Sequence, residues 1–246
     1  MKKFNLYLLL SLLAIIPIVQ SCDLDDDDGY SLGNYVVALA TVKATTGSSP
    51  YFILDNGEKL WPAAALVPYQ GLADGTRIIG NFTILSDSLH GFDHYVRLNN
   101  YSTILTKNVI NLTEANKDSI GDDPVRITDI WYGGGYINVE FDMNLPNTHK
   151  HRVNLVKNTT KQYPSDGYEY LEYRYNDMDD TTGYIGHSIV SFWIDYPRLV
   201  NSALKGWKIR INSAVNGEKT ITIDLSTKSG TVSLKTPTAE PTQSIN

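Results

Sequence analysis

Hydrophobic and polar residues alternate along much of the chain after residue 34. The segment 136–144 shows this most clearly, because every second residue from Ile137 to Met143 is apolar and the residues between them are polar or charged. Such alternation predicts a strand with one face on a core and the other in solvent. Similar patterns occupy segments 125–131, 152–157, 168–175, 189–195, 207–212 and 220–225. The number and spacing of these short strands predict an antiparallel β-sandwich.

The first half of the chain also predicts strands, with a less regular alternation. Residues 51–54 and 59–61 flank Asn56-Gly57, a dipeptide typical of a tight hairpin turn. Asp74-Gly75 marks a second turn before the apolar segment 77–85. Further strand segments are expected at 35–44 and 95–107. Because only 112–117 resembles a helical turn, we predict an all-β fold.

A polar segment separates the two halves. Residues 116–124 (NKDSIGDDP) contain glycine and proline and few apolar side chains, which is typical of a linker. We therefore predict a β-domain at 35–115 and the β-sandwich at 125–235. Residues 236–246 contain two prolines and little that could join a core, so we expect a flexible tail.

The first 21 residues have the pattern of a secretory signal peptide. Two lysines, at positions 2 and 3, precede an apolar run that is shorter than the about 20 residues needed to cross a bilayer. The run ends in Val19-Gln20-Ser21-Cys22, which resembles a lipobox, and Cys22 is the only cysteine of the chain. We expect residues 1–21 to be a lipoprotein signal peptide and Cys22 to be the lipidation site. The alternative is an ordinary signal peptide that ends near a chance cysteine.

Five aspartates follow this cysteine closely: Asp23, Asp25, Asp26, Asp27 and Asp28. Like charges at this density keep a segment extended and hydrated, so we expect an acidic tether at 22–34. The run also resembles an export signal of Gram-negative gut anaerobes for the outer face of the outer membrane. That resemblance implies a lipid-anchored protein at the cell surface, and a periplasm-facing anchor is the alternative. Calcium binding is disfavoured because the spacing and turn glycine of a calcium loop are missing.

The charge of the chain narrows the choice of partner. The formal net charge is −6, and loss of the two signal-peptide lysines would leave −8. Such an acidic balance argues against a nucleic acid as partner. The remaining classes are a membrane, reached through the lipid anchor, and a glycan or protein ligand.

Several motifs occur in the order found in NigD-like lipoproteins. They are Gly29-Tyr30-Ser31-Leu32-Gly33, Leu60-Trp61-Pro62, Asp74-Gly75-Thr76-Arg77-Ile78, Trp131, Tyr136-Ile137-Asn138-Val139, His151-Arg152-Val153-Asn154-Leu155-Val156 and Leu171-Glu172-Tyr173-Arg174. The chain resembles this family over essentially its whole mature length. The resemblance implies an N-terminal OB-type barrel, a C-terminal β-sandwich, and a bacteriocin-immunity or accessory role. It supplies no catalytic residues, and Tyr175 stands where the family often has histidine.

An OB-type barrel can bind oligosaccharides across one face. Trp61, Tyr69 and Tyr95 are therefore the candidate ligand platform, because aromatic rings can stack on sugars. The alternative for each of them is packing in the core or at its rim.

No metal site or cofactor is predicted. His149 and His151 have the two-residue spacing that would place them on one face of a strand, but no third ligand is evident nearby. His90 and His94 flank an expected loop, and a metal site there is disfavoured. The turn with Asp177, Asp179 and Asp180 is more typical of solvated carboxylates than of a calcium site.

No catalytic residues are predicted either. No carboxylate pair stands out as acid and nucleophile. Gly186-His187-Ser188 lacks the second glycine of a nucleophile elbow, and Gly133-Gly134-Gly135 lacks the lysine of a phosphate loop. We therefore expect a non-catalytic binding or accessory module. The alternatives are an immunity-type protein that acts by protein contact and a hydrolase of surface glycans.

Overall fold

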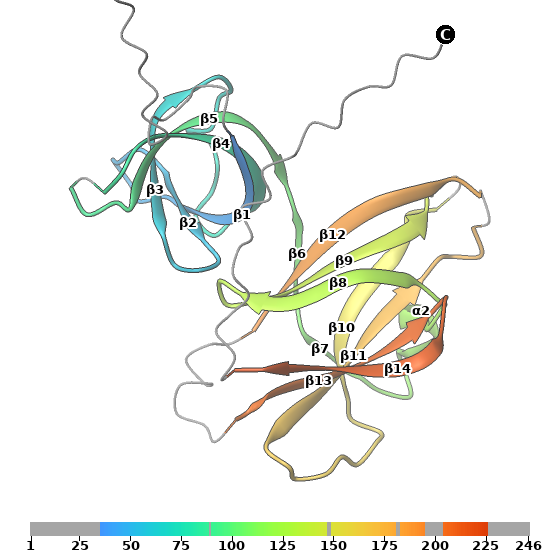
Figure 1. Ribbon diagram of the computed structural model, residues 1–246. Coiled ribbons are helices and arrows are strands. Elements are labelled where there is room, and N and C mark those ends of the chain that lie inside the picture. The colour runs from blue at the N-terminus through green and yellow to red at the C-terminus, as the bar shows by residue number, and fades with distance from the viewer. Residues whose placement is uncertain (1–34, 89, 147–148, 181–182, 195–203, 226–246) are drawn as a thin grey trace, which may run out of the picture. The chain divides into compact units, whose positions relative to one another are not determined.

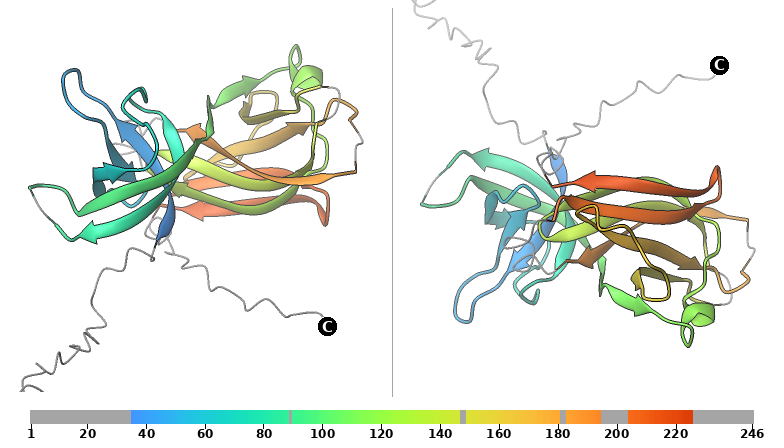
Figure 2. Two further views of the ribbon diagram at one scale, coloured as in Figure 1. Left: turned by 90° about the horizontal axis from the view of Figure 1, so that it is seen from above. Right: turned by 90° about the horizontal axis from the view of Figure 1, so that it is seen from below.

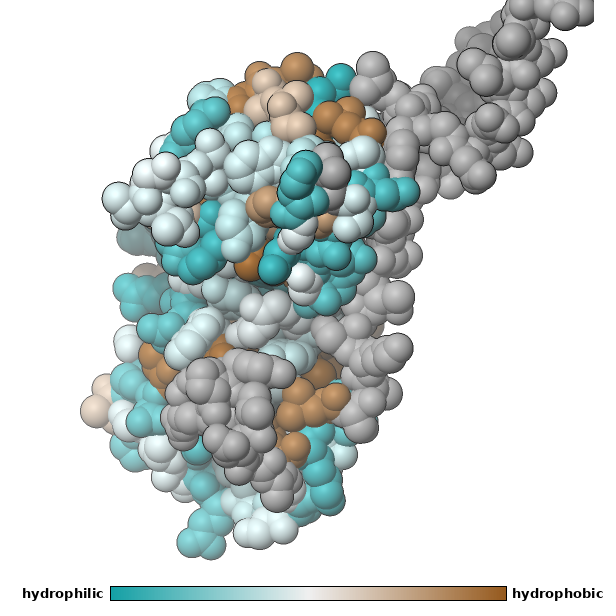
Figure 3. Space-filling view, turned by 90° about the vertical axis from the view of Figure 1, so that its left-hand side faces the viewer, coloured by the Kyte–Doolittle hydropathy of each residue, from teal (hydrophilic) through white to brown (hydrophobic). Residues whose placement is uncertain are grey.

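The computed structural model describes residues 35–88, 90–146, 149–180, 183–194 and 204–225. The expected signal peptide (1–21), the acidic tether (22–34) and the tail (236–246) lie outside the described residues. The described residues all belong to one compact unit. Within the described part of the chain, no helix is long and apolar enough to cross a membrane. The fold is almost entirely β, as predicted from the alternation, and the face drawn in Figure 3 is mostly hydrophilic with separate hydrophobic patches.

Five strands close into a barrel (Figure 1). They are β1 (Val36–Lys43), β2 (Tyr51–Leu54), β3 (Lys59–Ala65), β4 (Arg77–Ser86) and β5 (His94–Thr103). Their order around the barrel is β1-β2-β3-β5-β4, in which β3 and β5 run parallel and the other pairs antiparallel. This confirms the OB-type barrel that the family resemblance implied.

Alternation along the strands fills the barrel. On β5, Val96 and Leu98 are fully buried, whereas the residues on either side of them are partly exposed. Phe52 and Phe82 pack against each other inside, with ring centroids 5.5 Å apart. Gly80 makes room for this packing, because a Cβ there would lie 2.3 Å from the Phe82 ring.

The second domain is a sandwich of two sheets (Figure 1, Figure 2). One sheet has the order β14-β13-β11-β10-β7 and the other β6-β12-β9-β8. The strands are β6 (Leu105–Asn108), β7 (Ile110–Leu112), β8 (Arg126–Gly133), β9 (Tyr136–Asn144), β10 (Arg152–Asn158), β11 (Tyr168–Asn176), β12 (Ile185–Trp193), β13 (Gly206–Ser213) and β14 (Gly217–Asp224). Both sheets contribute to the core, which includes Val139 and Phe192 from one and Trp207 and Leu155 from the other. The predicted β-sandwich is confirmed, but its sheets are mixed and not purely antiparallel, because β7 with β10, β11 with β13 and β6 with β12 pair in parallel.

The boundary between the domains differs from the predicted one. The barrel ends with β5, and β6 and β7 pair within the two sandwich sheets. Residues 116–124 are therefore part of the sandwich and contain the helix α2 (Lys117–Ile120), whose Ile120 is 5% exposed. Ile120 packs with Leu112 and Val156. The polar composition suggested a linker, but its single isoleucine is a core residue.

Arg77 of β4 links the barrel to the sandwich. Its guanidinium donates two hydrogen bonds to the carboxylate of Asp55, at 2.5 and 3.0 Å, and a third to Oδ1 of Asn138 on β9, at 3.0 Å. The side chains of Arg77 and Asp55 are 0% and 4% exposed. The backbone of Gly134 comes close to the same carboxylate, because a Cβ there would lie 2.5 Å from Oδ1 of Asp55. The glycine turn between β8 and β9 thus permits this contact.

Candidate functional site

Four aromatic side chains gather on the outside of the barrel. Tyr51, Trp61 and Tyr95 occupy the outward positions of β2, β3 and β5, and Trp61 and Tyr95 are direct cross-strand neighbours. Phe92 enters from the loop before β5, and its ring centroid lies 5.0 Å from that of Trp61, 5.2 Å from Tyr51 and 6.3 Å from Tyr95. All four residues are partly exposed. We call this set the ring cluster.

The structure separates the three members of the predicted platform. Trp61 and Tyr95 come together in the ring cluster, but Tyr69 is only 7% exposed and its ring packs at 5.9 Å from Phe52 in the barrel core. Burial raises the pKa of the Tyr69 hydroxyl. Tyr69 therefore belongs to the core, which was the alternative considered for it.

Sequence reasoning missed the other two rings. Phe92 lies between Gly91 and Asp93 in a polar loop, and an aromatic residue in such a loop is the signal that could have found it. Gly91 has φ +85° and His90 has φ +52°, so the backbone turns sharply just before this ring. Tyr51 gives no such signal, because its strand alternation shows only that it faces outward.

Polar side chains continue the same outer face along β5 and β4. Nε of Arg97 donates to Oδ1 of Asn99 at 2.8 Å. Nδ2 of Asn99 donates to Oδ1 of Asn81 at 2.9 Å and to Oγ1 of Thr83 at 2.8 Å. We call Asn81, Thr83, Arg97 and Asn99 the polar ladder. These bonds hold the partly exposed side chains of Asn81, Arg97 and Asn99 in fixed orientations, whereas Thr83 is only 1% exposed.

Charges border the ring cluster. Lys43, the cross-strand neighbour of Tyr51, pairs with Asp74 at 3.0 Å. The backbone N–H of Ala44 and the ammonium of Lys43 lower the pKa of Asp74. Asp93 accepts a hydrogen bond from the backbone of Lys59 at 2.8 Å.

His94, which the sequence placed beside a loop, is the first residue of β5. Its two ring nitrogens lie 3.9 Å from carboxylate oxygens of Glu58 and Asp87. The loop end of the ring cluster is therefore rich in acidic side chains.

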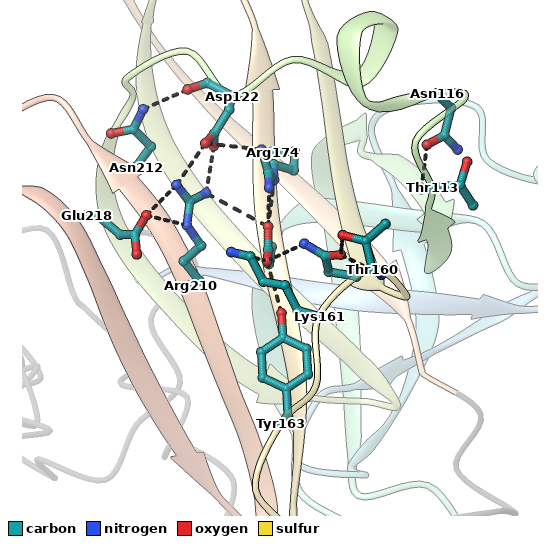
Figure 4. Close-up of polar contacts among 12 residues, drawn as sticks. Thr113, Asn116, Asp122, Thr160, Lys161, Tyr163, Arg174, Arg210, Asn212 and Glu218 are labelled. Atoms are coloured by element: carbon teal, nitrogen blue, oxygen red, sulfur yellow. Dashed lines mark hydrogen bonds and ion pairs between the residues drawn. The ribbon is translucent and has the colours of Figure 1, made fainter.

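A second polar arrangement lies on the sandwich and includes Asp122, Arg174 and Arg210 (Figure 4). Glu172 is 1% exposed and accepts hydrogen bonds from Asn158 at 2.9 Å, from Tyr163 at 3.0 Å and from Arg174. Burial alone would raise the pKa of Glu172, but these hydrogen bonds and the charge of Arg174 lower it to about 2. Within the Leu171–Arg174 motif, Glu172 and Arg174 therefore form a buried ion pair.

The arrangement extends to the segment before β8. Arg210 donates to both carboxylate oxygens of Asp122 at 2.7 Å, and Arg174 reaches the same carboxylate at 3.1 Å. Glu218 pairs with Arg210 at 2.7 Å, and Lys161 lies 3.4 Å from Glu172. Three carboxylates thus face three cations, and this balance indicates a structural role for the network.

The structure brings His151 close to Asp180, two residues that the sequence analysis considered for different metal sites. The ring of His151 has Nδ1 at 2.5 Å from the hydroxyl of Tyr175, and its Nε2 lies 3.7 Å from Asp180. His149 and Asp179 are exposed. Within the described residues, no three His, Cys, Asp or Glu side chains are placed to hold a metal ion.

Two family models match the chain. One is the NigD-like N-terminal OB domain, over residues 39–104, and the other is the NigD-like C-terminal beta sandwich domain, over residues 108–225. The break between them falls where β5 gives way to β6. Among proteins of curated function, none matches the chain.

Solved structures share the fold. A protein of unknown function from Bacteroides vulgatus is 39% identical, with a TM-score of 0.73 over 77% of this chain and 90% of that one. A candidate toxin-related protein from Parabacteroides distasonis is 31% identical, with a TM-score of 0.62 over 77% and 92%. A NigD-like immunity protein from Bacteroides caccae is 19% identical, with a TM-score of 0.55 over 76% and 90%, a likeness of fold alone.

Both domains are thus matched in order, by family models that together span most of the described residues. The chain belongs to the NigD-like family.

Proposed function

We propose that this protein is a lipid-anchored envelope protein that binds a ligand through the ring cluster of its barrel, without catalysis. The observation that carries the proposal is the grouping of Trp61, Phe92 and Tyr95 on the outer face of β3 and β5. Large aromatic rings kept at the surface of a small barrel cost solvation free energy, and contact with a ligand would recover it. Two rings of the cluster, Tyr51 of β2 and Trp61 of β3, also lie on the pair of strands through which OB folds bind ligands.

The lipid anchor rests on the N-terminal sequence. Cys22 follows a signal-like segment, and the aspartates at 23 and 25–28 follow Cys22. Several acyl chains on one cysteine hold a protein at a bilayer far more firmly than one chain does. We place the protein at the outer membrane, with its two β-domains on the cell surface.

A second candidate function is immunity by protein contact. Two relatives support it by name, the candidate toxin-related protein and the NigD-like immunity protein. On this alternative, expression of the chain should lower the sensitivity of a host cell to a toxin. Unchanged killing across the toxins of neighbouring strains would reject it.

Site-directed photo-cross-linking on intact cells tests the main proposal. A benzophenone side chain at position 95 of the full chain should give covalent adducts after irradiation, because this position lies within the ring cluster. The same group at position 184 is the control, since Tyr184 is 75% exposed on the sandwich. Equal yields at the two positions, or none at position 95, would refute the ring cluster as the binding surface.

A further inference from the structure

Building on the proposed function, we infer that the ring cluster and the polar ladder form one binding face for an uncharged, hydroxyl-rich polymer, a neutral glycan. The inference depends on the continuity of the two sets on the barrel. On β5, Tyr95, Arg97 and Asn99 alternate with the buried Val96 and Leu98, so all three point away from the core. The ring cluster and the polar ladder are therefore continuous along β5.

The neighbouring strand leaves this face open. Ala64 of β3 is the register partner of Arg97, and both Ala63 and Ala64 are exposed. Their methyl groups are too small to cover the guanidinium or the amides. A ligand lying on Trp61 would therefore meet only the small side chains of Ala63 and Ala64 on β3 as it extends toward Arg97 and Asn99.

The chemistry of the two sets is complementary to a sugar. A pyranose has an apolar face of C–H groups and a rim of hydroxyls that both donate and accept hydrogen bonds. Aromatic rings supply a surface for the C–H face. The two N–H groups of Asn99 are taken by Asn81 and Thr83, so a ligand would use the N–H groups of Asn81 and the remaining lone pairs of the two amide oxygens. Such a mixture of donors and acceptors suits hydroxyl groups, whereas a purely anionic or cationic ligand needs only one kind.

The charges at the border favour an uncharged ligand. Lys43 is already paired with Asp74, and the guanidinium of Arg97 is engaged by Asn99 and Thr83. Glu58 and Asp87 lie at the loop end, where they would repel a polyanion. Lys59 is exposed two residues before Trp61 on the same side of β3, but one lysine does not offset the two carboxylates for a polyanion, whereas a neutral polymer avoids that cost.

A groove is formed by the segment that follows Trp61. It starts at Pro62, the residue after Trp61, has a volume of about 440 Å³ and is lined by residues 62–70. Its lining includes Leu66, which is 68% exposed. A ligand that follows both the rings and this groove is longer than a single sugar, which favours a polymer.

Binding of the purified full chain to an array of neutral plant, yeast and host glycans tests the inference. The array also carries heparin as a polyanion and oligolysine as a polycation. We expect retention on at least one neutral glycan, quenching of tryptophan fluorescence on binding, and neither effect with heparin or oligolysine. Trp61→Ala should weaken the affinity about tenfold or more, and Asn99→Ala about threefold to tenfold.

Trp193→Ala is the matched control, because Trp193 is 44% exposed on the sandwich, and its affinity should equal that of the unmodified chain. Circular dichroism of each variant separates loss of binding from loss of fold. No neutral glycan retained, or retention that Trp61→Ala leaves unchanged, would overturn the inference. A different outcome is also possible: cross-linking at position 95 gives adducts that a protease digests, and the array retains no glycan. That result would support the proposed binding surface and refute only a glycan as its ligand.

Discussion

The hydroxyl of Tyr175 lies 2.5 Å from Nδ1 of His151, at the end of the sandwich where β11 meets the start of β10. Both side chains are almost fully buried, and Nε2 of the same imidazole faces Asp180 at 3.7 Å. Burial and the carboxylates of Asp177, Asp123 and Asp180 raise the pKa of Tyr175 to about 12, so the phenol stays protonated at neutral pH. The hydroxyl of Tyr175 thus orders the imidazole of His151.

Replacing this hydroxyl should cost the free energy of one hydrogen bond. Tyr175→Phe keeps the ring and its contact with Phe141, 6.3 Å away, but leaves Nδ1 of His151 without its partner. We expect the free energy of unfolding to fall by about 1 kcal/mol in urea denaturation. The control is Tyr184→Phe, at an exposed position where no change is expected. Equal stability of the Tyr175→Phe variant and the unmodified chain would contradict an ordering role for this bond.

Asp177, in the turn after β11, should destabilise the protein when it ionises. Partial burial and the nearby charge of Asp123 raise the pKa of Asp177 above its ordinary value. The folded state therefore holds this proton more tightly than the unfolded state, and its contribution to stability is present below about pH 3.8 and is lost as the pH rises through the raised pKa. Asp177→Asn should accordingly be more stable than the unmodified chain at pH 7 and equal to it near pH 3.

Thermal unfolding across this pH range measures the effect. Asn retains the acceptor that receives the backbone N–H of Asp179 at 2.9 Å, so the turn itself is preserved. Asp118→Asn, on an exposed face of α2, controls for the general loss of one negative charge. A stability difference that is the same at pH 3 and pH 7 would contradict the prediction.

Glu172 should show the opposite dependence on pH. Its pKa of about 2 lies below the unfolded value, so its contribution is present above about pH 4.5 and is lost as the pH falls toward 2. Glu172→Gln removes the charge that holds Arg174, and we expect a loss of about 2 kcal/mol at pH 7. The loss should shrink below pH 4.5.

A matched control lies in the same network. Glu218 also pairs with an arginine, Arg210, but its side chain is 65% exposed. Solvent screens such a pair, so Glu218→Gln should change the stability little. Equal losses for the two variants in urea denaturation would mean that burial of Glu172 does not set its contribution.

The sequence predicted the positions of the strands better than the contacts between distant residues. Segment 136–144 was predicted correctly because strand alternation is a local property, and its buried Val139 and Phe141 alternate with polar residues as expected. The linker at 116–124 was wrong because the role of a polar residue depends on distant contacts. Asp122 pairs with Arg210, 88 residues further on, and no local pattern reveals this.

The ring cluster was half predicted for the same reason. Trp61 and Tyr95 are adjacent only because β3 and β5 run parallel, a pairing that skips β4. Tyr69 is aromatic like Trp61 and Tyr95, but it lies in the segment after β3, and its ring packs against Phe52 in the core. Outward or inward placement of a single aromatic residue in a loop is decided by tertiary packing.

The contact of Arg77 with Asp55 should be among the most sensitive in the described part of the molecule. Arg77→Met fills a similar volume but leaves the carboxylate of Asp55 buried without its cation. We expect a loss of about 4 kcal/mol. Lys43→Met breaks an ion pair of the same barrel that is about half exposed, so little change is expected. Similar unfolding midpoints of both variants in urea would refute a special role for the buried pair.

The proposed anchor gives a prediction about location. Cys22→Ala removes the only thiol that could carry lipid, so the protein should move from the membrane fraction to the soluble fraction of fractionated cells. Replacing Asp23 and Asp25–Asp28 with Asn keeps the thiol but removes the acidic run. That variant should remain in the membrane fraction and lose its accessibility to protease on whole cells. A Cys22→Ala protein that stays with the membrane would refute lipid anchoring, and unchanged protease accessibility of the Asn variant would refute the export signal.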